Sequence, residues 1–580
     1  MFSSKIESSP VENSIGVETA ILKENRHSLE NRLLADAGLT THGTSGGQSL
    51  PADDREALLT ALRSSKESDL ARFFEALTTV LPQITDGTWD DVIIAALAEG
   101  HRCPPDNKVA FQAFVVNLVL QNVQYLGPVI SRLVQSFAQV HEDAMSTIHE
   151  PLRCIVTFMP RSEELLQFYI EKHFPHSSRS DQEFVMYVRM VLGSLNYARE
   201  SIHIIISLLF RRLVALEVEY LTASEHHLEE QTAFGKDIPC PVSGESCEDS
   251  SVFDLECSER RELNAPLSGG ALVPAEFAEQ SAESLRRKLD MSLNHMFYFC
   301  KSACAIVPDS TLDALYTAFE THALPVARIR FVPFIMFVYL SESGPVYADT
   351  TLRRLLTVLV DSTRPKALRS RAVLYAGALA ASNRAVTFDV ALQWLRAISS
   401  WMHNQLGCEC PSEQMGALSQ KDFAEEPLYA SLIAALYVIG ARASHFLRSD
   451  LYREQVRSMR LARIMHWMPH LPAGMRLELI QAATIFPEFC FLTDRLGNYR
   501  EDAESLFVND CIPFREYGLP ESQQFVRAAR LPDETWAMPD MEFRFDTFQG
   551  ISRVSLYGSL SLGSTNGSSS NFGLTPPTST

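Results

Sequence analysis

The sequence predicts an all-α protein, a HEAT-like helical-repeat solenoid with a long acidic disordered loop between two helical blocks. Apolar residues recur three and four positions apart along most of the chain, which is the spacing of one helix face. Helix pairs recur at roughly 40-residue intervals, in the range of HEAT units. Strand-like alternation of apolar and polar residues is nearly absent.

Residues 366–406 give the strongest single indication of a helical repeat. The first predicted helix has one apolar stripe, formed by Leu368, Ala372, Tyr375 and Leu379. After a break at residues 381–384, a second stripe contains Ala391, Leu395, Ile398 and Met402. Two amphipathic helices on a short turn cannot bury all of their apolar surface, so the hairpin needs a similar neighbour.

The N-terminal part divides into two segments. Residues 1–55 are polar and lack a sustained apolar period, which predicts disorder. Residues 56–221 form the predicted N-terminal helical-repeat block. Its helix patterns include two over residues 108–138, parted by Gly127-Pro128, and further ones at about 142–158, 162–174, 181–197 and 201–222.

Residues 222–280 have a different composition. Glutamate and aspartate accumulate among serine, glycine and proline, and few apolar residues hold a period. This composition predicts an acidic mobile loop that is dispensable for folding.

The predicted C-terminal helical-repeat block spans residues 281–549. Ser310 and Asp313 resemble a capping box at the start of one of its helices. Residues 550–580 are Ser/Gly-rich and almost uncharged, which predicts a disordered tail.

The net charge of −20 disfavours strong direct binding to DNA, because an acidic chain repels a phosphate backbone. The charge is explained equally well by solubility and by selection of a basic partner. Eleven cysteines without a framework spacing, and no signal peptide, predict reduced thiols in a cytosolic or nuclear protein. No apolar run reaches the roughly 18 residues of a membrane span.

Motifs for catalysis, cofactors and metals are missing from the sequence. It contains no P-loop, G-x-G-x-x-G, H-E-x-x-H or G-x-S-x-G pattern. Adjacent carboxylates such as Glu163-Glu164 and Glu425-Glu426 diverge on a helix and do not form an acid–base pair. The Cys408-Glu409-Cys410 pair lacks the second pair that a zinc site needs. We therefore expect no enzyme, cofactor or metal, although distant residues could still assemble a site.

Residues 173–181, His-Phe-Pro-His-Ser-Ser-Arg-Ser-Asp, combine a helix end with a serine cluster. On residue type alone, Ser180 or Asp181 is the N-cap of the next helix. The alternative is a contact surface bearing hydroxyl groups, where phosphorylation would disrupt docking to an acidic or apolar partner.

Several segments share their order with a known family over roughly residues 105–540. They are 114–126, 174–188, 330–340, 371–384 and 427–437, with Ile512-Pro513-Phe514, Leu519, Ser522, Phe525-Val526, Pro532 and Trp536 near the end. Together they resemble the RNA polymerase I-specific transcription initiation factor family, the TIF-IA family. Arg330 replaces a Gln of the family pattern and Arg515-Glu516 replaces an Asp-Pro, so the chain is a diverged member.

The resemblance implies a HEAT-repeat solenoid that binds RNA polymerase I and bridges it to promoter-bound core initiation factors at ribosomal RNA genes, in the nucleus and nucleolus. It also implies that serine-bearing helix ends in the first block face the polymerase, which points to Ser177, Ser178 and Ser180. The alternative is a HEAT-type scaffold for transport or complex assembly.

Two dipeptides at the chain ends are candidate phosphorylation sites. Ser9-Pro10 and Thr575-Pro576 are the only Ser/Thr-Pro pairs, and both lie in predicted disordered segments. Chance explains two such pairs as well as selection does. The resemblance favours growth-linked phosphorylation, which would add roughly −1.5 to −2 charges at each site.

Overall fold

The computed structural model of the chain describes most residues between 56 and 532. The gaps are at 57–58, 61, 64–66, 84–88, 101–107, 140–141, 143–144, 235–274, 307, 409–425, 462–475, 490–511 and 516. Residues 1–55, the predicted acidic loop between 235 and 274, and residues 533–580 therefore lie outside the described residues.

The first block consists of helices joined by short turns. In chain order they are α4 (Glu67–Val80), η1 (Leu81–Gln83), α5 (Asp90–Glu99), α6 (Lys108–Gln121), η5 (Val123–Tyr125), α7 (Leu126–Gln135), η6 (Ser136–Ala138), α8 (Met145–Phe158), α9 (Ser162–Lys172), α10 (Asp181–Ser194) and α11 (Ile202–Phe234).

The second block is also helical. It contains α12 (Ala275–Ile306), α13 (Pro308–Ala318), the π-helical turn η8 (Phe319–Ala323), α14 (Phe334–Ser343), α15 (Pro345–Val360), α16 (Lys366–Ser382), α17 (Phe388–Cys408), α19 (Pro427–Ala441), α20 (Ala443–Arg448), α21 (Asp450–Ser458), α23 (Arg476–Ile485), η11 (Pro487–Phe489) and α26 (Gln523–Ala529).

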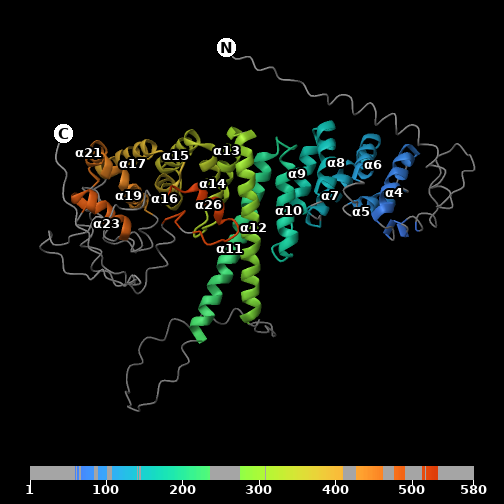
Figure 1. Cartoon of the computed structure of the whole chain (residues 1–580), viewed down its shortest axis with the longest axis horizontal. Helices are drawn as coiled ribbons and strands as arrows, with labels where there is room; N and C mark the ends of the chain where they lie inside the picture. Colours follow the sequence, from blue (N-terminus) through green and yellow to red (C-terminus); the bar gives the residue numbers. More distant parts are fainter. Residues whose placement is uncertain are drawn as a thin grey trace, which may run out of the picture.

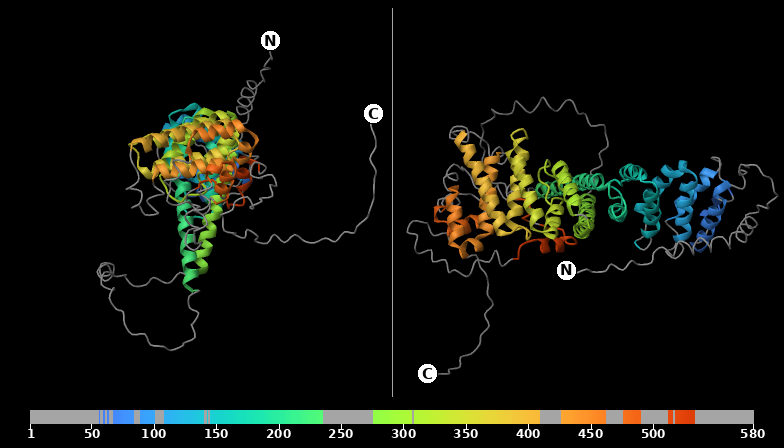
Figure 2. Two further views of the ribbon diagram at one scale, coloured as in Figure 1. Left: turned by 90° about the vertical axis from the view of Figure 1, so that its left-hand side faces the viewer. Right: turned by 90° about the horizontal axis from the view of Figure 1, so that it is seen from above.

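In the first block, each helix packs against the helix two places further along the chain. One row contains α4, α6 and α8, and the other contains α5, α7 and α9. The result is an elongated body with the two blocks at opposite ends (Figures 1 and 2). The described residues contain no strand beyond one isolated bridge, between Asn383 and Arg530. The predicted all-α helical-repeat fold is confirmed.

Helices α11 and α12 join the two blocks and lie side by side, extending together out of the body (Figure 1). The predicted loop over residues 222–280 is wrong at both ends, since α11 continues to Phe234 and α12 begins at Ala275. The physical reason is helix propensity: residues 222–234 include three Glu and two Ala, which favour helix, and the first helix breaker is Gly235. Acidity was a poor guide to the boundary because glutamate favours helix.

Two local predictions were also wrong. The break between α6 and α7 lies at Asn122, whereas Gly127-Pro128 lies in the first turn of α7. Proline is tolerated there because the first-turn N–H has no partner within the helix. Ser310 and Asp313 are not a capping box, because α13 begins earlier, at Pro308.

Helix α16 is at the centre of the second block. It packs between α15 and α19, so residues 372–382 are buried on all sides. The predicted single apolar stripe therefore understates its burial. A Cβ atom on Gly377 would lie 2.6 Å from the Ala434 Cβ and 3.0 Å from its Cα, which shows how closely α16 and α19 approach.

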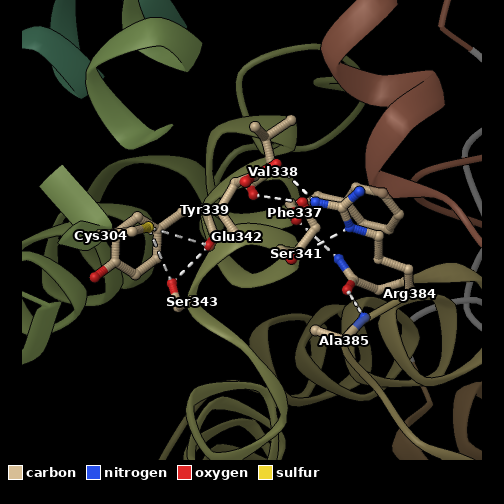
Figure 3. A network of polar contacts seen from close by, with 10 residues as sticks. Cys304, Phe337, Val338, Tyr339, Ser341, Glu342, Ser343, Arg384 and Ala385 are labelled. Carbon is tan, nitrogen blue, oxygen red and sulfur yellow. Dashed lines mark hydrogen bonds and ion pairs between the residues drawn. The ribbon is translucent and has the colours of Figure 1, made fainter. Parts of the chain in front are cut away.

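The turn after α16 is fixed by polar contacts to α14 (Figure 3). Asn383 Nδ2 donates to the Phe337 carbonyl at 2.8 Å, and Asn383 Oδ1 accepts from the Ala385 N–H at 2.9 Å. Arg384 donates to the Ser341 carbonyl at 3.3 Å and to Glu342 at 2.8 Å. These contacts hold the hairpin of α16 and α17 in register with α14.

Residues 512–532, described except for residue 516 and here called the C-terminal strap, return across the second block to α12 and α16. Asp290 on α12 accepts hydrogen bonds from the Ser522 hydroxyl and from the N–H groups of Glu521 and Ser522, the latter two at 2.9 Å. The Leu531 N–H donates to the Ser382 carbonyl at 2.9 Å. The strap therefore closes the second block over a long sequence separation.

A buried carboxylate joins the two blocks. Glu217 on α11 is fully buried and accepts from the N–H groups of Phe331 and Val332 at 2.8 Å, and from that of Arg330. Burial raises the pKa of the Glu217 carboxyl to about 7, against the opposing effect of these N–H donors and of the Arg330 guanidinium. Glu217 thus orders the turn before α14.

None of the described helices has, by itself, the length and apolar character of a membrane span. Residues 108–121 and 123–138 reach that composition only as a pair, which is bent by 119°.

The raised pKa of Glu217 gives a testable pH dependence. Between about pH 4.5 and 7 the folded chain binds more protons at this carboxyl than the unfolded chain, so its stabilising contribution is complete below pH 4.5 and is lost as the pH rises through 7. We compare the free energy of unfolding of the native protein with that of Glu217→Gln. We expect the native value minus the variant value to be higher at pH 5 than at pH 8, by roughly 2–3 kcal/mol. Urea unfolding at the two pH values measures it.

The matched control is Glu219→Gln, which changes an exposed carboxylate on the same helix and should give similar differences at both pH values. A larger difference at pH 8 for Glu217→Gln would contradict the prediction. It would mean that the N–H donors, rather than burial, set the charge state of the carboxyl.

The close approach of α16 and α19 predicts that Gly377→Ala lowers the free energy of unfolding by about 1–3 kcal/mol through overpacking. This loss should appear although alanine favours helix over glycine by roughly 1 kcal/mol. Ala434→Gly in the same chain removes the facing Cβ and should recover part of the loss. Gly518→Ala is the control, since a Cβ there meets nothing within 4 Å. Unchanged thermal unfolding of Gly377→Ala would contradict the prediction.

Candidate functional site

Ser177, Ser178 and Ser180 lie in the turn between α9 and α10. Ser180 is the N-cap of α10, and its hydroxyl accepts from the Glu183 N–H at 3.2 Å. The predicted capping role is therefore confirmed for Ser180. The Ser178 hydroxyl lies 3.1 Å from His176 Nδ1. Both Ser178 and Ser180 are exposed, whereas Ser177 is half-buried.

The turn is fastened to the second block through α12. Lys288, only 4% exposed, donates to the Ser177 carbonyl at 2.7 Å and lies 3.5 Å from the Asp181 carboxylate. Asp181 also accepts from the Ser284 hydroxyl and pairs with Arg287 at 3.6 Å. The backbone of the serine turn is therefore held rigidly, while two of its hydroxyl groups face solvent.

A cavity of about 430 Å³ lies beside this turn, between the ends of α7 and α9 and the start of α10. Three cationic side chains line it, against one acidic side chain, Glu183, among the described lining residues. The basic and histidine residues are Arg132, Lys172, His173, His176 and Arg179. The serines do not line the cavity but are interleaved in sequence with residues that do.

Within the cavity, His173 is held as a neutral hydrogen-bonding group. Its Nε2 lies 2.9 Å from the Ser131 hydroxyl, and its ring stacks on Tyr169 with centroids 5.9 Å apart. Burial, and then the charge of Lys172, lower the pKa of His173 from its usual range. His173 therefore adds no positive charge at neutral pH.

An apolar patch on α9 continues this surface. Phe168 is 57% exposed, and Lys172 lies one turn further along the helix with its Nζ 5.8 Å from the Phe168 ring centroid. Exposed aromatic side chains are enriched among the contact residues of protein interfaces.

The carboxylates weighed as acid–base candidates have other roles. Glu163 is buried and accepts from the Ser201 N–H at 2.8 Å and from its hydroxyl at 2.7 Å, whereas Glu164 is exposed. Glu426 pairs with Lys366 at 2.9 Å. No group of three or more His, Cys, Asp or Glu side chains is placed to hold a metal ion within the described part of the chain. Glu425, Ser9 and Thr575 lie outside the described residues, as does the side chain of Cys408.

Sequence reasoning located the serine turn but missed the basic cavity next to it. Arg132 comes from α7 and reaches the cavity only because α7 packs against α9 in the two-row arrangement. The available signal was the polar face of α7, where Arg132 interrupts an apolar run. That signal could not specify which later residues Arg132 would meet.

The chain was compared with known families and structures. Residues 50–478 match the family described as RNA polymerase I specific transcription initiation factor RRN3. The family match begins before residue 105, where the resemblance of the sequence motifs begins. It ends before Ile512, so it does not include the last motifs. No curated protein matches the chain by sequence.

Among solved structures, the chain is similar to one described as the crystal structure of RNA polymerase I transcription initiation factor Rrn3. The TM-score is 0.58 at 16% sequence identity, with 90% of this chain and 100% of that chain covered. At this identity the likeness concerns the fold. The family match, which extends over most of the chain, carries the assignment: the chain belongs to the RNA polymerase I specific transcription initiation factor family RRN3.

Proposed function

We propose that this transcription initiation factor binds RNA polymerase I and recruits it to promoter-bound core factors at ribosomal RNA genes, in the nucleolus. The observation that carries the proposal is the family match over residues 50–478, which includes the first helical block and most of the second. The mechanism is recruitment through protein contacts. An elongated body with separate surfaces suits a protein that must touch two partners at once (Figure 2).

We place the polymerase contact at the serine turn and the adjoining basic cavity. The chain has a net charge of −20, yet this surface presents Lys172 and Arg179 in the lining of the cavity, with Lys172 beside the exposed ring of Phe168. A local positive surface on an acidic protein favours an acidic or apolar patch on the partner. Added negative charge at the serines would oppose such a contact. Strong direct binding to DNA is not part of the mechanism.

The variant Ser177→Asp, Ser178→Asp, Ser180→Asp tests this surface. Aspartate is also a good N-cap, so α10 keeps its cap and the thermal unfolding midpoint should stay close to that of the native protein. Three fixed negative charges should weaken polymerase binding about tenfold or more, since like charges brought together at an interface cost several kcal/mol. Titration of purified polymerase I with the labelled factor measures the change.

The control is the triple Asn variant, which matches Asp in size and caps helices but adds no charge. It should bind like the native protein. Equal binding by the Asp and Asn variants would place the interface elsewhere. Co-purification of transport cargo in place of polymerase subunits would favour the scaffold alternative.

We further propose that Ser9 and Thr575 are phosphorylated in growing cells and that this modification tunes engagement of the polymerase. Each phosphate adds roughly −1.5 to −2 charges at neutral pH. Phosphopeptide mapping from growing and starved cells should show occupancy that changes with growth, and Ser9→Ala with Thr575→Ala should remove the growth dependence of polymerase co-purification. Finding neither site modified in either state would contradict the proposal.

A further inference from the structure

Lys288 on α12 is a buried lysine whose ammonium group reaches into the first block. Its side chain is 4% exposed, and its Nζ donates to the Ser177 carbonyl at 2.7 Å and lies 3.5 Å from the Asp181 carboxylate. Ser177 belongs to the serine turn, and Asp181 is the first residue of α10 after it. The turn is therefore completed by a residue that lies 111 positions after Ser177 in the chain.

The peptide group between Ser177 and Ser178 is held on both sides. Its carbonyl accepts from Lys288, and its N–H donates to His176 Nδ1 at 3.2 Å. The Ser178 hydroxyl lies 3.1 Å from the same ring nitrogen, and the Arg179 N–H donates to the His176 carbonyl at 3.0 Å. His176 and Arg179 both line the basic cavity. Lys288 thus orients the one peptide plane that connects an exposed serine hydroxyl with the lining of the cavity.

The contact between α10 and α12 does not depend on this lysine. The two helices pack directly against each other. Both place fully buried apolar side chains in the core, among them Val188 on α10 and Leu289 and Leu293 on α12. The Ser284 hydroxyl also donates to Asp181 from α12. Without the ammonium group of Lys288, the helices would still be held together.

The stability of the fold does not explain a lysine at this position. Removing an ammonium group from water is costly, and Asp181, whose side chain is 27% exposed, offsets only part of that cost from 3.5 Å. A methionine side chain would fill a similar space without the cost. A fixed turn does explain the lysine, because a surface that already has its bound arrangement loses less conformational entropy when a partner binds.

We propose that Lys288 is a positioning residue of the polymerase contact and that α12 is therefore part of that site. The inference rests on the function proposed above for the serine turn. Lys288 is buried, so it acts through the Ser177–Ser178 peptide group, which sets where the Ser178 hydroxyl and the His176 ring lie. The contact is thus assembled from both helical blocks, although the serines all come from the first.

The test uses the full-length chain with Lys288→Met and the matched control Arg286→Met. Each removes one positive charge from the same part of α12, but Arg286 pairs with Glu283 on its own helix, at 2.7 Å. Both variants should keep a thermal unfolding midpoint close to that of the native protein. In the free factor, hydrogen exchange of the Ser178 and Arg179 amides should become about tenfold faster in Lys288→Met, because the turn opens more often. Arg286→Met should exchange like the native protein.

Titration of purified polymerase I with the labelled factor is the second measurement. Lys288→Met should weaken binding by about three- to tenfold, since the turn must then be ordered on binding. Arg286→Met should bind like the native protein. Lys288→Gln keeps an N–H donor without the charge, so it should lie between the native protein and Lys288→Met in both measurements. It also replaces Lys288→Met in the test if that variant does not fold.

The outcomes separate this inference from the function on which it rests. Native exchange and native polymerase binding by Lys288→Met, with weakened binding by the triple Asp variant, would overturn the role of Lys288 and leave the surface in place. Equal binding by the triple Asp and triple Asn variants would remove the surface itself, and the role of Lys288 with it. A lowered unfolding midpoint with unchanged exchange at Ser178 and Arg179 would also overturn the inference, because it would show a purely structural lysine.

Discussion

Buried carboxylates that bind the turns before later helices are the interactions on which the joining of this fold depends. Glu217 on α11 accepts from N–H groups in the turn before α14, Asp290 on α12 accepts from those before α26, and Glu163 on α9 accepts from the Ser201 N–H before α11. Each carboxylate therefore satisfies turn donors that would otherwise lack a partner in the interior. Each bond also fixes where a later helix begins, which apolar packing alone does not specify.

The electrostatics of the molecule follow from where the chain places its basic groups. A net charge of −20 makes the average surface unfavourable for anions. The cavity beside the serine turn runs against this average, with Arg132 from α7 and Lys172 from α9. These cations are brought together by the packing of α7 against α9, so the packing of the helices also sets where positive charge lies.

Much of the fold could be predicted from the sequence because helices are local. The stripes in residues 366–406 gave α16 and α17, and residue type gave the cap at Ser180. What could not be predicted depends on distant partners. Three features require the packed structure. They are the N–H groups bound by Glu217 and Asp290, the burial of α16 on all sides, and the position of Arg132 beside the α9–α10 turn. The end of α11 differs from the predicted boundary for another reason: acidic composition predicts disorder, although glutamate also favours helix.

The strap has a consequence for synthesis on the ribosome. The partners of Asp290 lie 231 and 232 residues further along the chain. At about 5–20 residues per second, roughly 10–50 s pass between translation of α12 and translation of the strap. The first block, whose helices contact near neighbours in sequence, can fold during that interval. The aromatic surface that receives the strap, including Phe334 and Phe337, stays uncovered until the strap emerges. Nascent chains of this protein therefore expose an aromatic surface late in elongation, and a premature stop before residue 512 would release a chain with that surface open.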